Sequence, residues 1–441
     1  LLDYSLEPAL EDHLDRVDRI REEEGDAAAA DAFFDFRTAD IAMGSGHFLV
    51  GAVDRIEKAF RNYLQKTTLT GVEEELNNLK HAAEAAFADE EYTPDIERSQ
   101  LLRRQIARRC IYGIDLNGLA TELARLSLWV HTFVPGLPLT FLDYNMQTGD
   151  SLAGIGTLDE VTEILDVDQA SLSMFAGGGS VMKEIRDDLE ELGQFADISA
   201  EQVRAARETR RELDEQLEPL RARFDILAAS RINDDIDTDS VSNTGVDDLT
   251  ELPSYDRALE VLESTNPLHF PAAFPEVFDG ESSGFDVIVG NPPWEKTQIE
   301  RHEFWGRYHP GLRGVSQRER ESIMDDLEAE RPDLAAEFER LKDVEEKRGK
   351  ILTNGPYPGI GKSHPDLYKA FSWRFWNLVD RNGDVGVVLP RSCFIGPGME
   401  QFRRRVLDDG EVSDLTFLKN KAGWVFDGVE PRYTIALFSF H

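Results

Sequence analysis

The sequence Asn-Pro-Pro-Trp at positions 291–294 combines hydrogen-bond acceptors with a flat aromatic face. It follows the apolar run 287–290, which is typical of a buried parallel strand that ends in a loop. Neither proline has an N–H, so the strand cannot continue. The proline carbonyls and the Asn291 side chain then form a fixed group of acceptors beside the Trp294 indole. This group fits an exocyclic amino group on a planar ring, and the plain alternative is a strand followed by a Pro-Pro turn.

A second segment, residues 38–50, has the pattern of a strand, a glycine loop and a helix. Gly44 and Gly46 allow the backbone to turn sharply and to approach a ligand closely. A Gly-x-Gly sequence alone is shared by dinucleotide sites and plain turns. The segment by itself therefore predicts a ligand loop without identifying the ligand.

Two acids follow in positions where an α/β sheet holds its ligands. Asp115 ends the apolar strand 111–115 and precedes a helical pattern over 119–129, where an acid can accept from both hydroxyls of a ribose. Asp150 lies in the segment Thr-Gly-Asp-Ser-Leu at 148–152. Either acid alone is more often a helix N-cap or a turn residue. The functional interpretation depends on their order with the glycine loop and the Asn-Pro-Pro-Trp sequence.

Together these segments resemble the motifs of amino-directed methyltransferases that use S-adenosylmethionine (SAM), most often DNA adenine-N6 enzymes. Residues 40–46 resemble the family's Asp-Pro-x-x-Gly-Ser-Gly loop, with Ile41 in place of the usual proline. The order, with the glycine loop first, resembles the γ class. The resemblance covers about 36–152 and 285–441, and it is strongest to the long methylases of type IIG restriction–modification and BREX-type phage-defence systems.

The resemblance implies a role for each matched residue. The catalytic residues would be Asn291, Pro292, Pro293 and Trp294. The SAM-binding residues would be Asp40, Ala42, Met43, Gly44, Gly46, His47, Phe48, Asp115, Leu116, Asp150 and Ser151. Asp150 would accept from the adenine amino group of the cofactor. Trp294 and Phe426 would stack on the target base, and for Phe426 a core position at a strand end is an equal alternative.

The implied fold is α/β, a Rossmann-like SAM-methyltransferase with a twisted, mostly parallel sheet, a C-terminal antiparallel hairpin within 424–440 and two helical insertions. We expect the following divisions: 1–35, an N-terminal helical segment with a truncated start; 36–152, the SAM-binding half; 153–284, a helical insertion with a mobile loop; 285–441, the catalytic half, with a charged helical insertion at about 315–350. A recognition domain or a nuclease would lie outside this fragment.

Composition sets limits on location and partners. The 441 residues include only two cysteines, which excludes a disulfide framework and suits a cytoplasmic protein. No apolar run reaches the length of a membrane span, and no Cys/His cluster has zinc spacing, so we expect neither a membrane partner nor a metal. Residues 332–347 fit the pattern of a nuclease metal site, but 321–350 has a helical pattern that excludes that chemistry.

The formal charge of −37 conflicts at first sight with binding to double-stranded DNA, which is a polyanion. Lysine occurs only 12 times, so arginine supplies most of the 48 basic residues. Such a surface is typical of a halophilic protein, in which salt screens the excess acid. DNA would then contact local arginines, and the candidates are Arg301, Arg307, Arg313 and Arg403–Arg405. Arginine groups of this kind are more often a solvated helix face than a DNA contact.

The sequence thus predicts a site-specific DNA methyltransferase that transfers a methyl group from SAM to adenine N6 of a flipped base, in restriction–modification or phage defence. Two alternatives stay open. The first is another amino or amide target: cytosine N4, RNA adenine or a protein glutamine. The second is a catalytically silent DNA-binding subunit, for which decay of the two loops would be expected.

Overall fold

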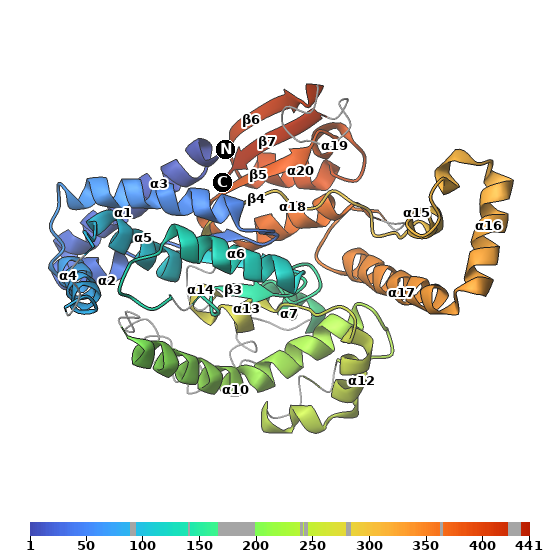
Figure 1. Cartoon of the computed structure of the whole chain (residues 1–441), viewed down its shortest axis with the longest axis horizontal. Coiled ribbons are helices and arrows are strands. Elements are labelled where there is room, and N and C mark those ends of the chain that lie inside the picture. The colour runs from blue at the N-terminus through green and yellow to red at the C-terminus, as the bar shows by residue number, and fades with distance from the viewer. Residues whose placement is uncertain are drawn as a thin grey trace.

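The structure is a computed structural model, and it describes most of the chain. The described residues are 1–88, 94–139, 142–165, 199–238, 241, 246–278, 284–361, 365–421 and 434–441. The predicted stacking residue Phe426 and the three glycines at 177–179 lie outside these residues. Of the segment 230–250, which we predict to be a mobile loop, only 239–240 and 242–245 lie outside them. Figure 1 shows a central sheet with helices on both faces and a helical arm that projects from the body.

The sheet has seven strands in the order β3-β2-β1-β4-β5-β7-β6. Their bounds are β1 Thr38–Asp40, β2 Ile111–Asp115, β3 Met146–Thr148, β4 Phe285–Gly290, β5 Val379–Pro390, β6 Val412–Lys419 and β7 Thr434–Phe440. Strands β1 to β5 pair in parallel, whereas β7 is antiparallel to both β5 and β6. This confirms the predicted fold class, a mostly parallel Rossmann-like methyltransferase sheet with an antiparallel C-terminal pair.

The antiparallel pair is made differently from the hairpin that we predicted within 424–440. β7 pairs with β6, which comes from upstream residues 412–419, so the predicted segment supplies β7 alone among the strands that the structure describes. The apolar alternation in 434–440 identifies β7 correctly. β6 carries mostly exposed side chains, and its weak pattern explains why the sequence did not indicate it.

The strand order reverses between β1 and β4, because the chain passes from β1 to β2 and β3 on one side before it returns to β4 on the other. Open α/β sheets bind ligands at such a reversal, outside the carboxyl ends of the strands. Asp40 ends β1 and pairs with Gly113 of β2, while Ala39 pairs with Ile288 of β4. The carboxyl ends of β1, β2 and β4 therefore lie side by side.

Two apolar layers cover the sheet, and β4 shows how one strand serves both. Val287 and Val289 belong to the core on one face, and Ile288 belongs to the core on the other, as the two-residue period of a strand requires. The first face is covered by helices of the N-terminal region: α1 Leu6–Glu23, α2 Asp26–Ala32, α3 His47–Leu64, α4 Thr70–Ala85, α5 Arg98–Arg109 and α6 Gly118–His131. The second is covered by α13 Phe270–Ala273, α14 Pro275–Phe278, α18 Leu367–Leu378, α19 Ser392–Ile395 and α20 Glu400–Asp409.

The region between β3 and β4 contains its own apolar cluster. Its helices are α7 Leu158–Leu165, α10 Ala200–Ser230, η2 Val246–Glu251 and α12 Pro253–Leu262. α10 packs against α12. The N-cap of α10 is Ser199, whose side chain accepts from the Gln202 amide. α10 also contacts α13, so the region packs against one of the helices that cover the second face of the sheet.

The arm follows β4 and consists of α15 Arg301–Gly306, η3 Leu312–Gly314, α16 Gln317–Glu330 and α17 Pro332–Asn354. A small core of Phe304, Trp305, Leu312, Met324 and Phe338 holds it together. α17 leads from the outer part of the arm back to the body, where its residues Ile351 and Leu352 are buried. Among the described residues, no helix is long and apolar enough to cross a membrane.

Candidate active site

The glycine loop joins β1 to α3 and folds over the end of β2. Gly44 and Gly46 have φ values of +55° and +78°, in the left-handed region that glycine adopts without strain. A Cβ on Gly46 would lie 3.1 Å from Cβ of Ala124 on α6, so a glycine at this position also allows the loop to pack closely against α6. A Cβ on Gly44 would meet nothing within 4 Å, which leaves open space in front of the loop. The amino end of α3 follows directly, and such an end attracts negative groups.

Asp115, at the end of β2, organises this loop. Its Oδ2 accepts from the Gly44 amide at 2.9 Å, and its Oδ1 accepts from the Asn117 amide at 2.8 Å. The carboxylate is half-buried, and each oxygen keeps a lone pair for a ligand. Leu116 beside it is 48% exposed, which places an apolar side chain next to the acid. A nucleoside fits this combination, with its ribose hydroxyls on the acid and its base against an apolar surface.

Asp150 follows β3 and is buried. Its Oδ1 accepts from the amides of Leu152 and Ala153, which is the turn role that an isolated acid would have. Its Oδ2 accepts from Nε of Arg348, on α17, at 3.3 Å. The neighbouring Ser151 hydroxyl donates to the Ile41 carbonyl at 2.6 Å. The structure therefore joins the Asp150 segment to the glycine loop, as the predicted site requires.

Arg348 is a site residue that the sequence did not indicate. It lies in the charged helix α17 among many similar arginines and acids, and nothing in the local pattern distinguishes it. Its side chain also pairs with Glu345 at 2.9 Å. The pKa of Glu345 is raised above its usual value, mainly by burial. The charge of Arg348 opposes this rise, and the charges of Asp150 and Glu295 add to it. These charges show that α17 lies against both the Asp150 segment and the residues that follow Trp294.

Asp40 lies between the two loops. It is buried, its Oδ1 accepts from the Ala42 amide at 3.1 Å, and a Cβ on Gly290 would come within 2.7 Å of that oxygen. Gly290 is therefore needed for β4 to end so close to β1. Burial raises the pKa of Asp40 to about 7, the Ala42 amide opposes the rise, and the charge of Asp115 adds to it.

The raised pKa of Asp40 predicts that the protonation of this residue makes the stability of the protein depend on pH. The ordinary pKa of 3.8 applies when the chain is unfolded, so between pH ~4 and ~7 the folded protein binds more protons. The free energy of unfolding should fall as pH rises through this window, by up to about 4 kcal/mol for this group. Asp40→Asn should remove that fall, as measured by urea unfolding at several pH values. Parallel pH profiles for the wild type and Asp40→Asn would contradict the assignment.

The Asn-Pro-Pro-Trp loop begins where β4 ends. Asn291 and Pro293 are exposed, Pro292 is buried, and Trp294 is half-buried against the core of the second face. The residues that follow are held by the segment before α18: the Leu367 amide donates to the Glu295 carbonyl at 2.7 Å, and the Thr297 amide donates to the Pro365 carbonyl at 3.2 Å. The loop is thus fixed at both ends, with the Asn291 side chain facing outward.

Met43, a predicted cofactor residue, takes part in the glycine loop through its backbone amide, because its side chain points into the core. The Met43 side chain is buried in the core, and a Cβ on Gly113 would come within 2.2 Å of its Sδ. The Met43 amide donates to the Ile114 carbonyl at 3.0 Å, which fixes the loop over β2. Phe48 packs half-buried on the same core, whereas His47 is exposed at the start of α3.

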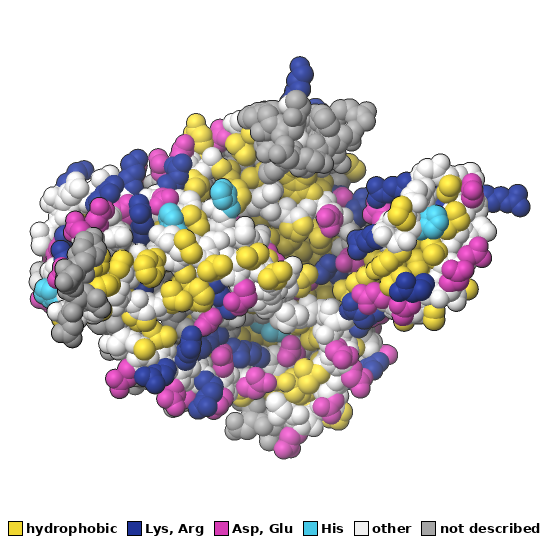
Figure 2. Space-filling model, viewed as in Figure 1, with side chains coloured by type: hydrophobic (Ala, Val, Ile, Leu, Met, Phe, Trp, Pro, Cys, Tyr) yellow, Lys and Arg dark blue, Asp and Glu magenta, His cyan; other side chains and the backbone are white. Residues whose placement is uncertain are grey.

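Most of the candidate DNA-contacting arginines already have partners. Arg301 pairs with Glu321, Asp325 and Glu328, and thereby fastens α15 to α16. Arg313 pairs with Glu303, Arg405 pairs with Asp409, and Arg403 donates to the carbonyls of Cys393 and Gly396. Arg307 and Arg404 are exposed. Figure 2 shows basic side chains interspersed with acidic ones on the face in view.

The mostly parallel sheet, with the antiparallel strand β7 between β5 and β6, is consistent with a Rossmann-like methyltransferase fold. The family model of the Eco57I restriction-modification methylase matches residues 109–321. This range contains Asp115, Asp150 and the Asn-Pro-Pro-Trp loop. The match supports a DNA methyltransferase of the restriction–modification type. No curated protein matches the chain.

Proposed function

We propose that this protein transfers a methyl group from SAM to the N6 amino group of an adenine that is flipped out of duplex DNA. The observation that supports this most is the joining of the strand ends: Asp40 contacts the loop of β1 and approaches Gly290 of β4, while Asp115 of β2 binds the Gly44 amide. A cofactor loop and an amino-binding loop then border one site. In this proposal the catalytic unit comprises 36–152 and 285–441, separated by the helical insertion.

The residues present fit SAM. Asp115 would accept from the ribose hydroxyls, Leu116 would contact the adenine ring, and Asp150 would accept from the adenine amino group. The open space before Gly44 would take the methionine portion. When bound, SAM supplies a methyl group that is already activated on a sulfonium, so the protein's task is mainly to position the reactants.

The catalytic loop would bind the target amino group. The Asn291 side-chain oxygen and the Pro292 carbonyl would accept from its two N–H groups, which leaves the nitrogen lone pair free to face the methyl group. Trp294 would stack on the base, and the predicted second aromatic is Phe426. The base must leave the duplex to reach this loop, as the general behaviour of DNA methyltransferases requires.

The biological setting that we propose is a restriction–modification or phage-defence system, with γ-class motif order. The family match to a restriction-modification methylase supports the first of these roles. The test of the substrate class is to incubate the protein and labelled SAM with duplex DNA, with RNA and with a protein extract in parallel. Label in DNA supports the proposal. Label confined to RNA or protein would contradict it, and no transfer to any of the three would indicate a silent binding subunit.

DNA binding should tolerate unusually high salt. The charge of −37 and the ion pairs of Arg301, Arg313 and Arg405 imply few phosphate contacts. Because the logarithm of the affinity falls by about 0.9 per phosphate contact for each tenfold rise in salt, we expect a slope no steeper than about −4. Fluorescence anisotropy over a salt series measures it. A slope steeper than about −6 would contradict a halophilic surface with few contacts.

A further inference from the structure

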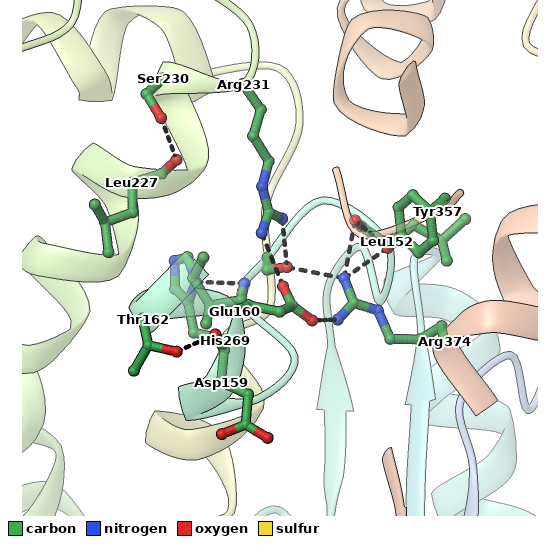
Figure 3. A network of polar contacts seen from close by, with 12 residues as sticks. Leu152, Asp159, Glu160, Thr162, Leu227, Ser230, Arg231, His269, Tyr357 and Arg374 are labelled. Atoms are coloured by element: carbon green, nitrogen blue, oxygen red, sulfur yellow. Dashed lines mark hydrogen bonds and ion pairs between the residues drawn. The ribbon is translucent and has the colours of Figure 1, made fainter. Parts of the chain in front are cut away.

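The segment after Asp150 is held by a buried arginine from the other half of the sheet. Arg374 lies on α18 and is fully buried. Its Nη2 donates to the carbonyls of Leu152 at 3.2 Å and Gly154 at 3.0 Å. The Tyr357 hydroxyl accepts from the same nitrogen at 2.6 Å and donates to the Leu152 carbonyl at 2.8 Å. Figure 3 shows these groups converging on one turn of the chain.

A buried carboxylate balances this arginine and a second one. Glu160 accepts from Nη1 of Arg374 at 2.6 Å and from Nη2 of Arg231 at 2.8 Å, and Arg231 also donates to the Gly154 carbonyl at 3.3 Å. Burial alone would raise the pKa of Glu160, but the two guanidinium groups hold it below its usual value. The acid therefore stays charged and keeps both guanidinium groups oriented toward the backbone carbonyls.

Two glycines of this segment leave the space that neighbouring groups occupy. A Cβ on Gly156 would lie 1.7 Å from Nη1 of Arg374, and a Cβ on Gly154 would lie 1.9 Å from the Leu268 carbonyl oxygen. The Ile155 amide donates to Nδ1 of His269 at 3.0 Å. Because Nδ1 accepts this bond, the ring proton of His269 lies on Nε2, which is 3.1 Å from Oδ1 of Asp225 on α10. Residues 152–156 are thus fixed through consecutive backbone groups.

These contacts come from outside the predicted SAM-binding half. Arg374 and Tyr357 follow the Asn-Pro-Pro-Trp loop in the sequence, and Arg231 and Asp225 belong to the helical insertion. All act on the few residues that follow Asp150, whose Oδ1 is itself bound by the amides of Leu152 and Ala153. The position of the Asp150 carboxylate therefore depends on the position of residues 152–156.

We infer that Arg374 is a positioning residue for cofactor binding: by fixing residues 152–156, it sets the Asp150 carboxylate for the adenine of SAM. This inference rests on the proposed function. A buried ion pair is weak evidence for stability, since well-packed apolar residues often replace such pairs without loss. Here the guanidinium bonds go to backbone carbonyls beside one site residue, which is the arrangement expected of a group that holds a binding loop.

The test compares SAM binding in two variants by calorimetry. Arg374→Met keeps most of the apolar stem and removes the guanidinium, and we expect the Kd for SAM to rise at least ~10-fold. Tyr357→Phe keeps the buried ring and removes only the hydroxyl with its two hydrogen bonds, and we expect a smaller rise of about 3-fold because the Arg374 guanidinium remains in place. At saturating SAM, the kcat of each variant should stay within about 3-fold of the wild-type value, because no catalytic group moves.

The control is Arg16→Met. The Arg16 guanidinium also donates to a backbone carbonyl, that of Asp35 at 2.8 Å, but this contact lies before the amino end of β1, whereas the Asp150 segment follows the carboxyl end of β3. Its Kd for SAM should equal that of the wild type. Wild-type SAM affinity in a folded Arg374→Met protein would overturn the inference, and if that variant does not fold, unchanged affinity in Tyr357→Phe would do so. If the wild type itself binds no SAM, the proposed function fails first.

Discussion

Asn291→Ala is expected to lower the rate of methyl transfer to DNA by on the order of 10³-fold, by analogy with the loss of one oriented polar group from an active site. The Kd for SAM should stay within about 2-fold of the wild-type value. The physical reason is that Asn291 is exposed at the end of β4, where we assign it to the target amino group, whereas the assigned cofactor contacts come from β1, β2 and β3. Single-turnover assays and calorimetry measure the two quantities separately.

Gln298→Ala provides the control for this variant. Gln298 is an exposed amide in the segment that follows the catalytic loop, and its loss should leave the transfer rate unchanged. Transfer at the wild-type rate by Asn291→Ala would show that the catalytic assignment is wrong. A joint loss of SAM binding and transfer would instead show that the loop has a structural role.

Asp115→Ala should have the opposite profile, with its main effect on the cofactor. The variant would lose the acceptors for the ribose hydroxyls and also those for the amides of Gly44 and Asn117. We expect a loss of about 2–3 kcal/mol in SAM binding, which corresponds to roughly 30- to 150-fold in Kd. Asp115→Asn should be intermediate, because it keeps one acceptor oxygen.

Asp143→Ala is the matched control for Asp115→Ala. Asp143 pairs with Arg125 at 3.1 Å, away from the glycine loop, so its removal should leave SAM affinity unaltered. An unchanged Kd in a folded Asp115→Ala protein would show that the ribose is held by other residues. Circular dichroism and urea unfolding establish that each variant is folded.

The sequence predicted the parallel part of the sheet well because each signal is local. Residues 111–115 form β2 within the predicted bounds, and the apolar run that ends at Gly290 forms β4. Short apolar runs that end in a glycine or an acid, followed by a helical pattern, are typical of βα units. The predicted glycine loop and Asp115 meet through the hydrogen bond between Gly44 and Asp115, which supports the assignment of these residues to one site.

The contacts around Asp150 could not be predicted in the same way. Arg348 and Arg374 reach it or its neighbours from helices about 200 residues later in the chain. Arg348 does not stand out among the charged residues of α17, and Arg374 is one of two charged residues in the aromatic helix α18, where the local pattern does not indicate its partners. Their burial is a tertiary property that hydrophobic periodicity does not report. The same limit applies to Arg301, which we considered as a DNA contact, because its three carboxylate partners lie on another helix.

The central claim is that the protein methylates adenine N6 through the Asn291 loop, and nucleoside analysis tests it most directly. Duplex DNA would be incubated with SAM that carries a deuterated methyl group, with the wild-type protein and Asn291→Ala in parallel, and then digested to nucleosides for mass spectrometry. We predict labelled N6-methyladenosine (as the deoxynucleoside) with the wild type and an initial rate of its formation that is on the order of 10³-fold lower with Asn291→Ala. Label in N4-methylcytosine, or equal amounts of labelled adenine product with both proteins, would contradict the account.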